Sequence, residues 1–458
     1  METHSQQRQV LLVTTLTSFL TPFISSSVNI VLPPIGRELG LSAVMLGWIA
    51  SSFLLTTAAL LLPAGRLTDI YGRVKLFKAG IIVFSAGSLL CAAAPNGMML
   101  IFFRVIQGAG AAFIFSTSTA ILVSSYPAES RGKVLGINVA AVYTGLSSGP
   151  FLGGIIAEHL GWRHLFSINS VIGVLIIILA HRVMKMEWTE AKGEKFDLRG
   201  SVIYGSVLTA FMYGFSILPS IEGILLAAAG AAGFIFFILY ESRIADPVIN
   251  IPLFRENKRF AFSNLAALIN YSATFAAGFL LSFYLQYIKG FSPKEAGTVL
   301  IAQPVVMALF SPLTGRLSDK TDPGKVASAG MVVTTAGLFT LSFLQPDAGL
   351  HYIVISLIFL GFGFALFSSP NTNAIMSSVE KKHLGIASAS MSTMRMTGQM
   401  MSMGIALMIF SLFIGSDKIT SENHPALMSA IKWIFTLFSV LCIGGIFASL
   451  ARSSQRRP

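Results

Sequence analysis

One pattern of charged and small residues occurs twice in the chain, 250 positions apart. Gly-Arg-Leu-Thr-Asp at 65–69 is repeated as Gly-Arg-Leu-Ser-Asp at 315–319, and further basic residues follow each copy. Arginine and aspartate at this spacing can form ion pairs that hold two helices together in one state and release them in another, and the glycines permit tight turns. The alternative is a pair of turns whose solvated charges only fix the topology. The predicted latch residues are Gly65, Arg66, Asp69, Gly72, Arg73, Gly315, Arg316 and Asp319.

Two arginines lie inside long apolar stretches, where a cation is costly and functional by default. Arg104 is roughly 9 Å and Arg395 roughly 16 Å from the ends of their stretches, at about 1.5 Å per helical residue. Gln107 is three residues beyond Arg104 and on the same helix face. No Asp or Glu occupies the middle of an apolar stretch, so a polar site there favours anionic, zwitterionic or neutral ligands. For Arg104, the alternative is a side chain that reaches the lipid headgroups.

Amides and hydroxyls in other apolar stretches extend this polar set. Taken singly, such a residue more often forms a hydrogen bond between two helices, worth about 0.6 kcal/mol. Taken together, they imply that water reaches the middle of a membrane, and we predict a substrate cavity there. The predicted cavity residues are Ser25, Ser26, Asn29, Arg104, Gln107, Asn138, Asn270, Gln303, Asn371, Arg395 and Gln399.

Small residues are concentrated between positions 145 and 154. Gly145, Gly149 and Gly153 have the small-x-x-x-small spacing that lets helices approach closely, and Gly154 follows directly. Pro150 removes one backbone hydrogen bond and favours a bend. We predict that these five residues form a hinge or gate. Plain helix packing is the alternative.

Three carboxylates are candidates for binding a proton, because burial can raise a carboxyl pKa toward neutral pH. They are Asp69 in the first repeated pattern, and Glu158 and Glu222 near the ends of their stretches. None lies at mid-membrane. If the protein transports a solute, three possibilities therefore stay open. A carboxylate at an edge of the membrane couples transport to protons, another ion drives transport, or the protein is a uniporter.

The sequence lacks the patterns expected of a metal or nucleotide enzyme. Cys91 and Cys442 fall inside apolar stretches and are interpreted as small core residues. There is no Cys-x-x-Cys, no His-Glu-x-x-His and no phosphate-binding Gly-x-x-x-x-Gly-Lys. We expect no catalytic residues, no metal site and no cofactor.

The stretches that carry these residues are long enough to cross a membrane. The chain is 54% hydrophobic and 11% charged, whereas soluble domains carry roughly 25% charged residues. A helix needs about 20 apolar residues to span the hydrocarbon core. The sequence predicts an all-α integral membrane protein with fourteen spans, at 10–32, 45–65, 76–94, 98–123, 133–157, 163–183, 199–218, 221–241, 260–287, 295–315, 325–345, 349–373, 384–415 and 425–450.

Basic residues are distributed unevenly between alternate loops, and cytoplasmic loops are enriched in Lys and Arg. Most lie in the loops that include the two repeated patterns. The other loops hold only Arg37, Arg163, Lys289, Lys294 and Lys418. This predicts a multi-pass protein of the cell membrane with both termini in the cytoplasm. The net charge of +12 is then a topology signal and not a sign of nucleic-acid binding.

The repeated patterns also predict how the chain is divided. The first follows the second span and the other follows the tenth, whereas a simple duplication of six spans would place it after the eighth. Two extra spans therefore separate the halves. We predict a six-helix bundle at 1–184, a linker with the inserted pair at 185–258, and a second six-helix bundle at 259–458. The charged loop at 184–198 is interpreted as a solvated segment.

Taken in order, these motifs resemble the major facilitator superfamily, in its fourteen-helix drug:proton antiporter branch, over nearly the whole chain. The segment at 145–154 is similar to the motif typical of exporters. The other matching segments are 65–73, 104–110, 161–169, 363–372 and 387–398. The resemblance implies two bundles that rock around a midplane cavity, and export of small amphipathic compounds or drugs driven by proton influx.

One position departs from this branch, which usually carries Asp five residues before the Asn of its first helix. Here Ile24 precedes Asn29 at that distance, which weakens the case for cationic drugs. The alternative is an exporter or uniporter of an anionic or neutral metabolite without proton coupling. A transporter-like membrane sensor would need a signalling domain, and no loop is long enough for one. We expect a monomer without enzymatic activity, with a small-molecule substrate and the lipid bilayer as its partners.

Overall fold

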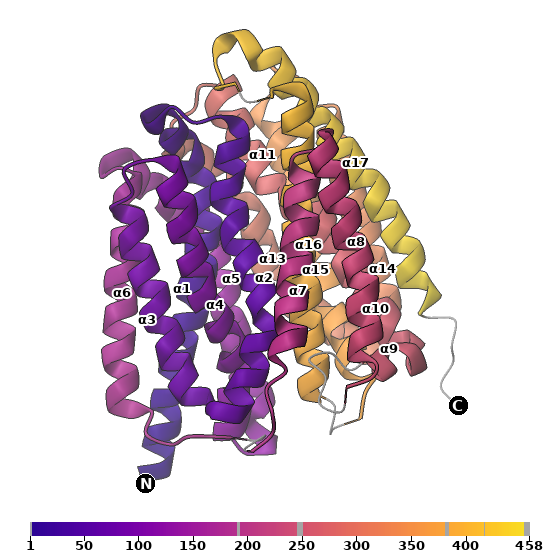
Figure 1. Cartoon of the computed structure of the whole chain (residues 1–458). Helices are drawn as coiled ribbons and strands as arrows, with labels where there is room; N and C mark the ends of the chain where they lie inside the picture. Colours follow the sequence, from indigo (N-terminus) through magenta and orange to yellow (C-terminus); the bar gives the residue numbers. More distant parts are fainter. Residues whose placement is uncertain (1, 190–192, 245–250, 381–383, 416, 453–458) are drawn as a thin grey trace.

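The computed structural model describes residues 2–189, 193–244, 251–380, 384–415 and 417–452, which are almost entirely helical. The long helices run side by side, and α1 begins toward the same end of the molecule at which α17 finishes (Figure 1). We call this the inner end and the opposite one the outer end. The helices are α1 (Glu2–Leu39), α2 (Ala43–Tyr71), α3 (Arg73–Ala92), α4 (Gly97–Ser125), α5 (Ala128–His159), α6 (Trp162–Val183), α7 (Leu198–Ser216), α8 (Ile221–Glu241), α9 (Ile251–Glu256), α10 (Lys258–Thr274), α11 (Ala277–Phe283), the π-helix η1 (Tyr284–Ile288), α12 (Pro293–Leu300), α13 (Ala302–Lys320), α14 (Pro323–Ser342), α15 (Leu350–Met376), α16 (Leu384–Phe413), the short 3₁₀ helix η3 (Ser421–Asn423) and α17 (His424–Ala451).

Thirteen helical segments in the described part of the chain are long and apolar enough to cross a membrane. They coincide with thirteen of the predicted spans. α7 covers the remaining one, but Arg199 and several glycines and serines lower its mean hydropathy. The predicted all-α membrane architecture is therefore confirmed.

The two repeated patterns lie inside helices, so the predicted tight turns at Gly65 and Gly315 are wrong. α2 continues to Tyr71 and α13 to Lys320. A glycine costs a helix only about 1 kcal/mol relative to alanine, and the neighbouring Arg and Leu are good helix formers. The reversal that follows the first pattern comes at Gly72, whose φ of 113° disfavours any side chain.

Two predicted spans are interrupted in the second half of the chain. The span at 260–287 is divided into α10, α11 and η1, and the span at 295–315 into α12 and α13. Pro304 explains the second interruption, because proline has no N–H to donate to the carbonyl of Leu300, where α12 ends. No proline or paired glycine marks the first interruption.

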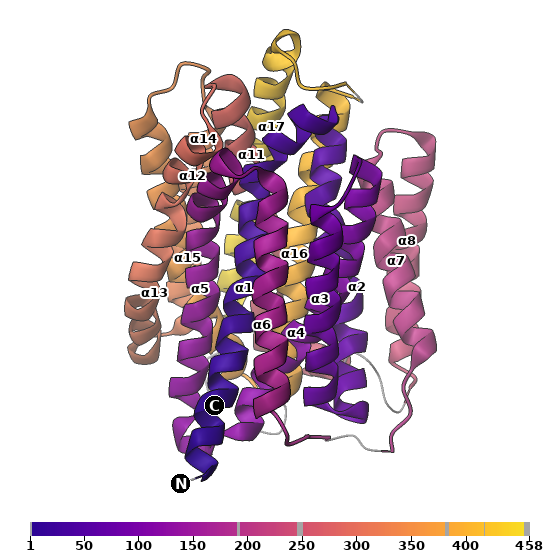
Figure 2. The same cartoon turned by 90° about the vertical axis from the view of Figure 1, so that its left-hand side faces the viewer.

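The inserted helices form a hairpin on one flank of the molecule. α7 packs along α8, and it also contacts α2 of the first half and α16 of the second half. Figure 2 shows this hairpin beside α2, at the edge of the bundle. The boundaries predicted for the two bundles and the linker stay predictions.

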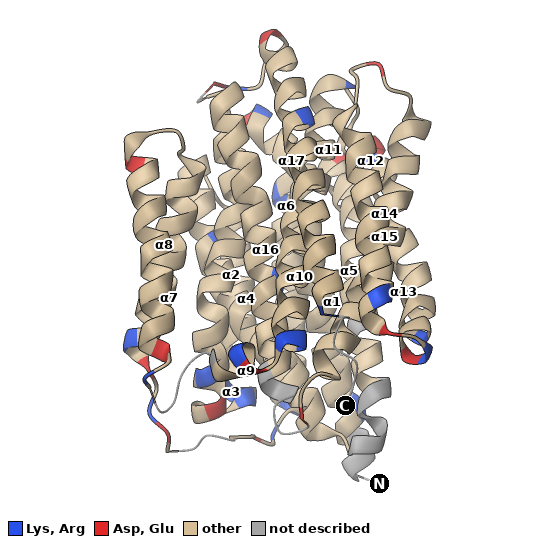
Figure 3. Ribbon diagram, turned by 90° about the vertical axis from the view of Figure 1, so that its right-hand side faces the viewer, with Lys and Arg blue, Asp and Glu red and all other residues tan. Residues whose placement is uncertain are grey.

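Lys and Arg are concentrated toward the inner end (Figure 3). This uneven distribution is what the positive-inside tendency of membrane proteins describes. The cytoplasmic location of the inner end follows from that tendency and stays a prediction.

Candidate functional site

The two halves of the chain meet closely at the outer end, where α5 packs against α12. A methyl group on Gly154 would lie 2.5 Å from the carbonyl oxygen of Pro293. A methyl group on Gly297 would collide with the carbonyl oxygen of Pro150. Side chains are excluded from both positions because the backbones themselves are in contact.

Hydrogen bonds between the halves add to this contact. Gln286 of η1 donates from Nε2 to the carbonyl of Ile30 on α1 at 2.8 Å, and Arg37 donates to the carbonyl of Gln286 at 3.3 Å. The backbone N–H of Lys294 donates to the Glu158 carboxylate at 3.2 Å. The outer ends of the two halves are therefore joined by close packing and by polar contacts.

We call the surface along which the two halves of the chain meet the seam. Only part of the predicted hinge lies at the outer end of this seam. Gly145, Gly149 and Gly153 face α1, where a methyl group on any of them would collide with that helix. These three residues thus serve packing within the first half, whereas Pro150 and Gly154 lie at the contact with α12. Bending at any of the five stays a prediction.

A polar contact joins the halves nearer the middle of the spans. The Tyr143 hydroxyl of α5 and the Ser368 hydroxyl of α15 are 2.8 Å apart. Arg395 of α16 is near enough for its charge to act on the Tyr143 phenol. We call Tyr143, Ser368 and Arg395 the central polar cluster; it draws on one helix of the first half and two of the second.

Arg395 is not fully satisfied in this position. The side chain is half-buried, and its Nε is buried without a hydrogen-bond partner among the described residues. Asn270, on the adjacent α10, is fully buried, and both atoms of its amide also lack partners within the described part of the chain. An unpaired buried polar group costs about 1–3 kcal/mol, so two of them on the packed helices α10 and α16 call for water or a ligand.

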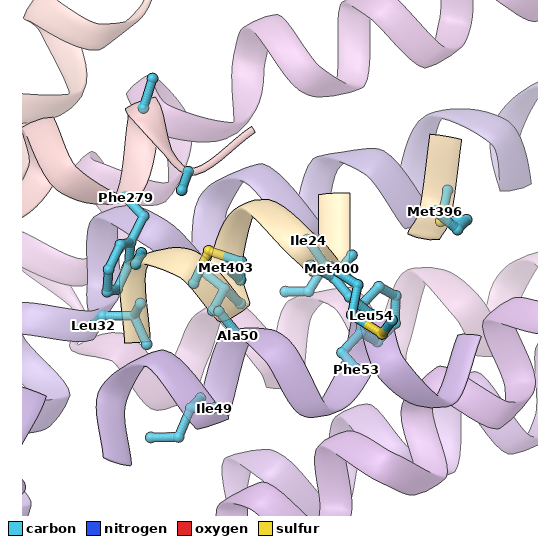
Figure 4. Packing of buried hydrophobic residues seen from close by; sticks show 14 of the residues in the cluster. Ile24, Leu32, Ile49, Ala50, Phe53, Leu54, Phe279, Met396, Met400 and Met403 are labelled. Atoms are coloured by element: carbon cyan, nitrogen blue, oxygen red, sulfur yellow. The ribbon is translucent and has the colours of Figure 1, made fainter. Parts of the chain in front are cut away.

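Ile24 occupies the position at which the resemblance predicts Asp, and the side chains around it are apolar as well. Ile24 is fully buried. Figure 4 shows it in an apolar cluster with Phe53 and Leu54 of α2 and Met400 of α16. A carboxylate there would be desolvated without a partner, so this part of the seam offers nothing to a cation.

Arg104 lies inside the first half and not on the seam. It is 1% exposed, donates from Nε to the carbonyl of Ile49 at 3.0 Å, and stands 4.3 Å from the centre of the Phe53 ring. It also donates to Gln107, whose amide donates to Ser88 at 2.6 Å. These contacts join α2, α3 and α4, and they exclude the alternative in which Arg104 reaches the lipid headgroups.

Asn371, also predicted for the cavity, is occupied at the inner end of the second half. It accepts a hydrogen bond from Arg452, a buried residue that directly follows α17. Arg452 also donates to the carbonyl of Gly324 at 3.1 Å. Burial lowers the pKa of Arg452 to about 10, against the opposing effect of Asp322. These bonds tie α14, α15 and α17 together.

The other predicted cavity residues are spread along the seam-forming helices. Asn138 is buried, and Ser25, Ser26, Asn29, Gln303 and Gln399 are half-buried. Arg395 is thus the one predicted residue that the structure places in the central polar cluster. Tyr143 and Ser368 were missed, because a single tyrosine or serine in an apolar span carries no signal of its partner.

The first repeated pattern is held by charges. Arg73 donates to the Asp69 carboxylate at 2.8 Å from Nη2 and to Ser124 of α4 at 2.9 Å from Nη1. Arg66 forms a salt bridge with Glu194 of the linker. These contacts lie within the first half and its linker.

The second pattern is arranged differently. Arg316 is exposed, and Asp319 accepts a hydrogen bond from Asn373 at 3.2 Å. No salt bridge to Arg316 or Asp319 occurs between described residues. The two copies are therefore unequal in this conformation, which fits a latch engaged on one side only.

We expect Asp69→Asn to slow transport about 10-fold, the change that corresponds to about 1.4 kcal/mol, while the melting temperature changes little. The pair is partly buried, with Arg73 8% and Asp69 34% exposed. The asparagine oxygen can still accept a hydrogen bond from Arg73, which limits the loss of stability, whereas loss of the negative charge would change the bias toward one transport state. Asp319→Asn is the matched control and should have a smaller effect on flux. Equal losses of flux in the two variants would show that the asymmetry of the patterns has no functional role.

The three carboxylates proposed for proton binding lie in separate places. Asp69 is paired with Arg73, Glu158 is at the outer seam, and Glu222 is exposed in the first turn of α8. They form no common relay, and the role of each in coupling stays a prediction.

The loop after α6 is not simply solvated, so that interpretation of 184–198 is wrong in part. Glu187 accepts hydrogen bonds from the backbone N–H groups of Val74 at 2.7 Å and Lys75 at 2.9 Å. The carbonyl of Trp188 accepts from the N–H of Arg73 at 3.1 Å. These bonds satisfy the first turn of α3, whose N–H groups have no partners within the helix.

Comparison with known proteins assigns the chain to a family. The model of the Major Facilitator Superfamily matches residues 14–288 and 263–458. The chain is 29% identical over 421 residues to the riboflavin transporter RibZ of Clostridioides difficile, covering 92% of this chain and 91% of RibZ. It is 31% identical over 433 residues to the uncharacterized transporter YebQ of Escherichia coli, covering 93% and 92% of the two chains.

Further relatives and solved structures agree. The multidrug resistance protein Stp of Mycobacterium tuberculosis is 27% identical over 424 residues, covering 91% of this chain and 78% of Stp. A bacterial homolog of the human lysosomal transporter Spinster, solved in an inward-facing and unoccupied conformation, shares the fold with a TM-score of 0.73 at 17% identity, over 99% of both chains. With its two matched halves and this shared fold, the chain belongs to the Major Facilitator Superfamily of multi-pass membrane transporters.

Proposed function

We propose that this transporter exports small amphipathic compounds across the cell membrane in exchange for protons, as a monomer whose inner end faces the cytoplasm. The two halves would rock against each other, so that the contact between α5 and α12 forms and breaks in each cycle. Relatives named as multidrug resistance proteins support export, although their names describe those proteins alone.

The observation that carries the proposal is the central polar cluster. A transport site that both halves can reach must lie where they meet, and Tyr143 and Ser368 meet there across the seam. The charge of Arg395 acts on Tyr143, and its buried Nε–H is a donor without a partner among the described residues. A substrate with an acceptor group and an apolar body would satisfy that donor and also contact the apolar cluster around Ile24 and Met400.

The charge of the cluster favours neutral or anionic amphiphiles over cations. Arg395 supplies a positive charge, and Ile24 stands where the resembling branch carries Asp. The relative named as a riboflavin transporter supports a substrate that is not a cation. A permanent cation in this site would be repelled by Arg395, and no carboxylate at position 24 would offset the repulsion.

One observation favours a second candidate, an exporter or uniporter of an anionic or neutral metabolite that is not coupled to protons. Within the described residues, the three candidate carboxylates are paired, at the outer rim, or exposed on the inserted hairpin. None of them adjoins the central polar cluster. Protonation of Asp69 or Glu158 would then have to affect the central polar cluster through a conformational change.

Flux in proteoliposomes under an imposed pH gradient tests the proposal. We expect a pH gradient to drive uptake of neutral and anionic amphiphiles, with proton release in the opposite direction, and to leave permanent cations untransported. Uptake that ignores the gradient would replace antiport with the uncoupled alternative. Gradient-driven uptake of cations alone would contradict the substrate class.

A further inference from the structure

A polar cavity lies away from the seam, at the inner end between α3 and α6. Its volume is about 330 Å³. Its wall includes Lys75 and Lys78 from the start of α3, and His181 and Lys185 from the end of α6 and the residues after it. Glu187 is the one carboxylate among the described residues of the wall. Cationic groups thus exceed anionic ones in a space large enough for a small headgroup.

Glu187 is held in place by backbone donors. Its two carboxylate oxygens accept from the N–H groups of Val74 and Lys75, at the positive end of the α3 dipole. Lys78 donates one hydrogen bond, from Nζ to the carbonyl of Met184 at 2.7 Å, and keeps two further donors. Among the described residues of the wall, three lysines thus face a single carboxylate, which acts on Lys78 and is held by backbone donors.

The rest of the wall is apolar and faces outward. Ile82 is 50% exposed and Met186 is 56% exposed, on helices or adjoining segments that border the lipid. Ala79 and Met184 complete the apolar part of the wall. A ligand held here would meet cationic groups at one end and the acyl-chain region at the other.

We propose that this cavity binds the phosphate headgroup of an anionic phospholipid from the leaflet at the inner end. Basic pockets between membrane helices on the cytoplasmic side suit such headgroups. The lysines would contact the phosphate, and the acyl chains would run along Ile82 toward the middle of the membrane. A free phosphate ion would use the lysines alone and leave the apolar wall unoccupied. This site is independent of the substrate site at the seam.

Native mass spectrometry of the purified full-length protein tests the proposal with phosphatidylglycerol, phosphatidylcholine and inorganic phosphate as separate probes. We expect retention of phosphatidylglycerol to exceed that of phosphatidylcholine, and to fall about 10-fold in a Lys75→Gln/Lys185→Gln variant. Both lysines are exposed, so their replacement leaves the packing of the helices intact. A Lys75→Arg/Lys185→Arg variant should retain the lipid and thereby shows that charge is what matters.

The chain offers a matched control in its second half. Lys325 is the third residue of α14, as Lys75 is the third of α3, and Lys320 is another exposed lysine at the same end. Lys320→Gln/Lys325→Gln should keep lipid retention at the wild-type level. Equal losses in the two double variants, or unchanged retention in Lys75→Gln/Lys185→Gln, would overturn the proposal. So would binding of inorganic phosphate that displaces the lipid fully at millimolar concentration, because it would leave the apolar wall without a role.

Discussion

Replacing Arg395 by glutamine is expected to reduce transport of neutral and anionic amphiphiles by about 10-fold or more. Hydrogen bonds to a charged group contribute about 1.5–3 kcal/mol, and each 1.4 kcal/mol corresponds to about a factor of 10. The glutamine amide retains a donor but loses the charge and the reach of the guanidinium. The loss should therefore appear mainly as weaker substrate binding, as a raised KM in proteoliposome flux.

Thermal unfolding separates this role from a structural one. The buried Nε of Arg395 has no partner among the described residues, so its removal takes away an unfavourable group rather than a stabilising bond. The melting temperature of Arg395→Gln should be unchanged or higher than that of the wild type. A transported anion should raise the melting temperature of the wild type and not that of the variant, because only a bound ligand stabilises the folded state.

Lys432→Gln is the matched control for Arg395. Lys432 is also a cation within a span, but it lies on α17 and donates to Gln345 at 3.2 Å, away from the seam. Its replacement should leave flux and KM unchanged. If Arg395→Gln transported normally, or if it lost flux only together with its folded state, the central polar cluster would not be the substrate site.

The second large effect is expected from Gly297→Val. A side chain at this position collides with the carbonyl of Pro150, and neither backbone can withdraw without separating α12 from α5. Overpacking costs about 1–3 kcal/mol, which shifts the balance between two states by about 5- to 150-fold. The valine raises the free energy of the conformation in which α5 and α12 are in contact. The variant should therefore stay open at the outer end and lose transport.

Labelling of a single cysteine reports the open state directly. Ser147 of α5 donates to the carbonyl of Pro304 across the seam at 3.1 Å, so Ser147→Cys is shielded when the halves are closed. The native Cys91 and Cys442 are fully buried and can be replaced by alanine. A membrane-impermeant maleimide added from outside should label Ser147→Cys rapidly in the Gly297→Val background and slowly without it.

Gly444→Val is the control for adding a β-branched side chain to a helix of this protein. An added Cβ at Gly444 meets no atom within 4 Å. Transport, and labelling of Ser147→Cys, should be the same with and without the Gly444→Val substitution. Slow labelling of Gly297→Val, with transport retained, would show that the contact between α5 and α12 does not have to open.

Much of the fold was predictable because it depends on local composition. Each span is an apolar stretch of sufficient length, and the close packing of 145–154 follows from glycine spacing alone. The interruption at Leu300 also has a local cause in Pro304. The end of α2 was misplaced because the helix-forming residues around Gly65 outweigh the glycine.

The site depends on which helices face each other, and local composition does not determine that. Tyr143 and Ser368 are 225 residues apart in sequence. Arg104 and Arg395 are alike as cations in apolar spans, yet only Arg104 is enclosed by partners. The carbonyl of Ile49 on α2 accepts from Arg104, and so does Gln107 on α4, which Ser88 of α3 holds in place. The Nε of Arg395 has no such partner among the described residues. The buried position of Arg452 likewise depends on Asn371, on another helix.

The inserted hairpin gives the molecule two unlike sides toward the membrane. On one flank, α7 touches both α2 and α16 and so covers the line along which those helices meet. On the other flank, α5 meets α12 and α13, and among the described residues neither inserted helix packs against this contact. The hairpin therefore lies against the contact between the two halves on one flank only. On the proposed function, a hydrophobic solute that concentrates among lipid chains would enter from the flank that the hairpin leaves uncovered, and the membrane itself would be the reservoir from which it is drawn.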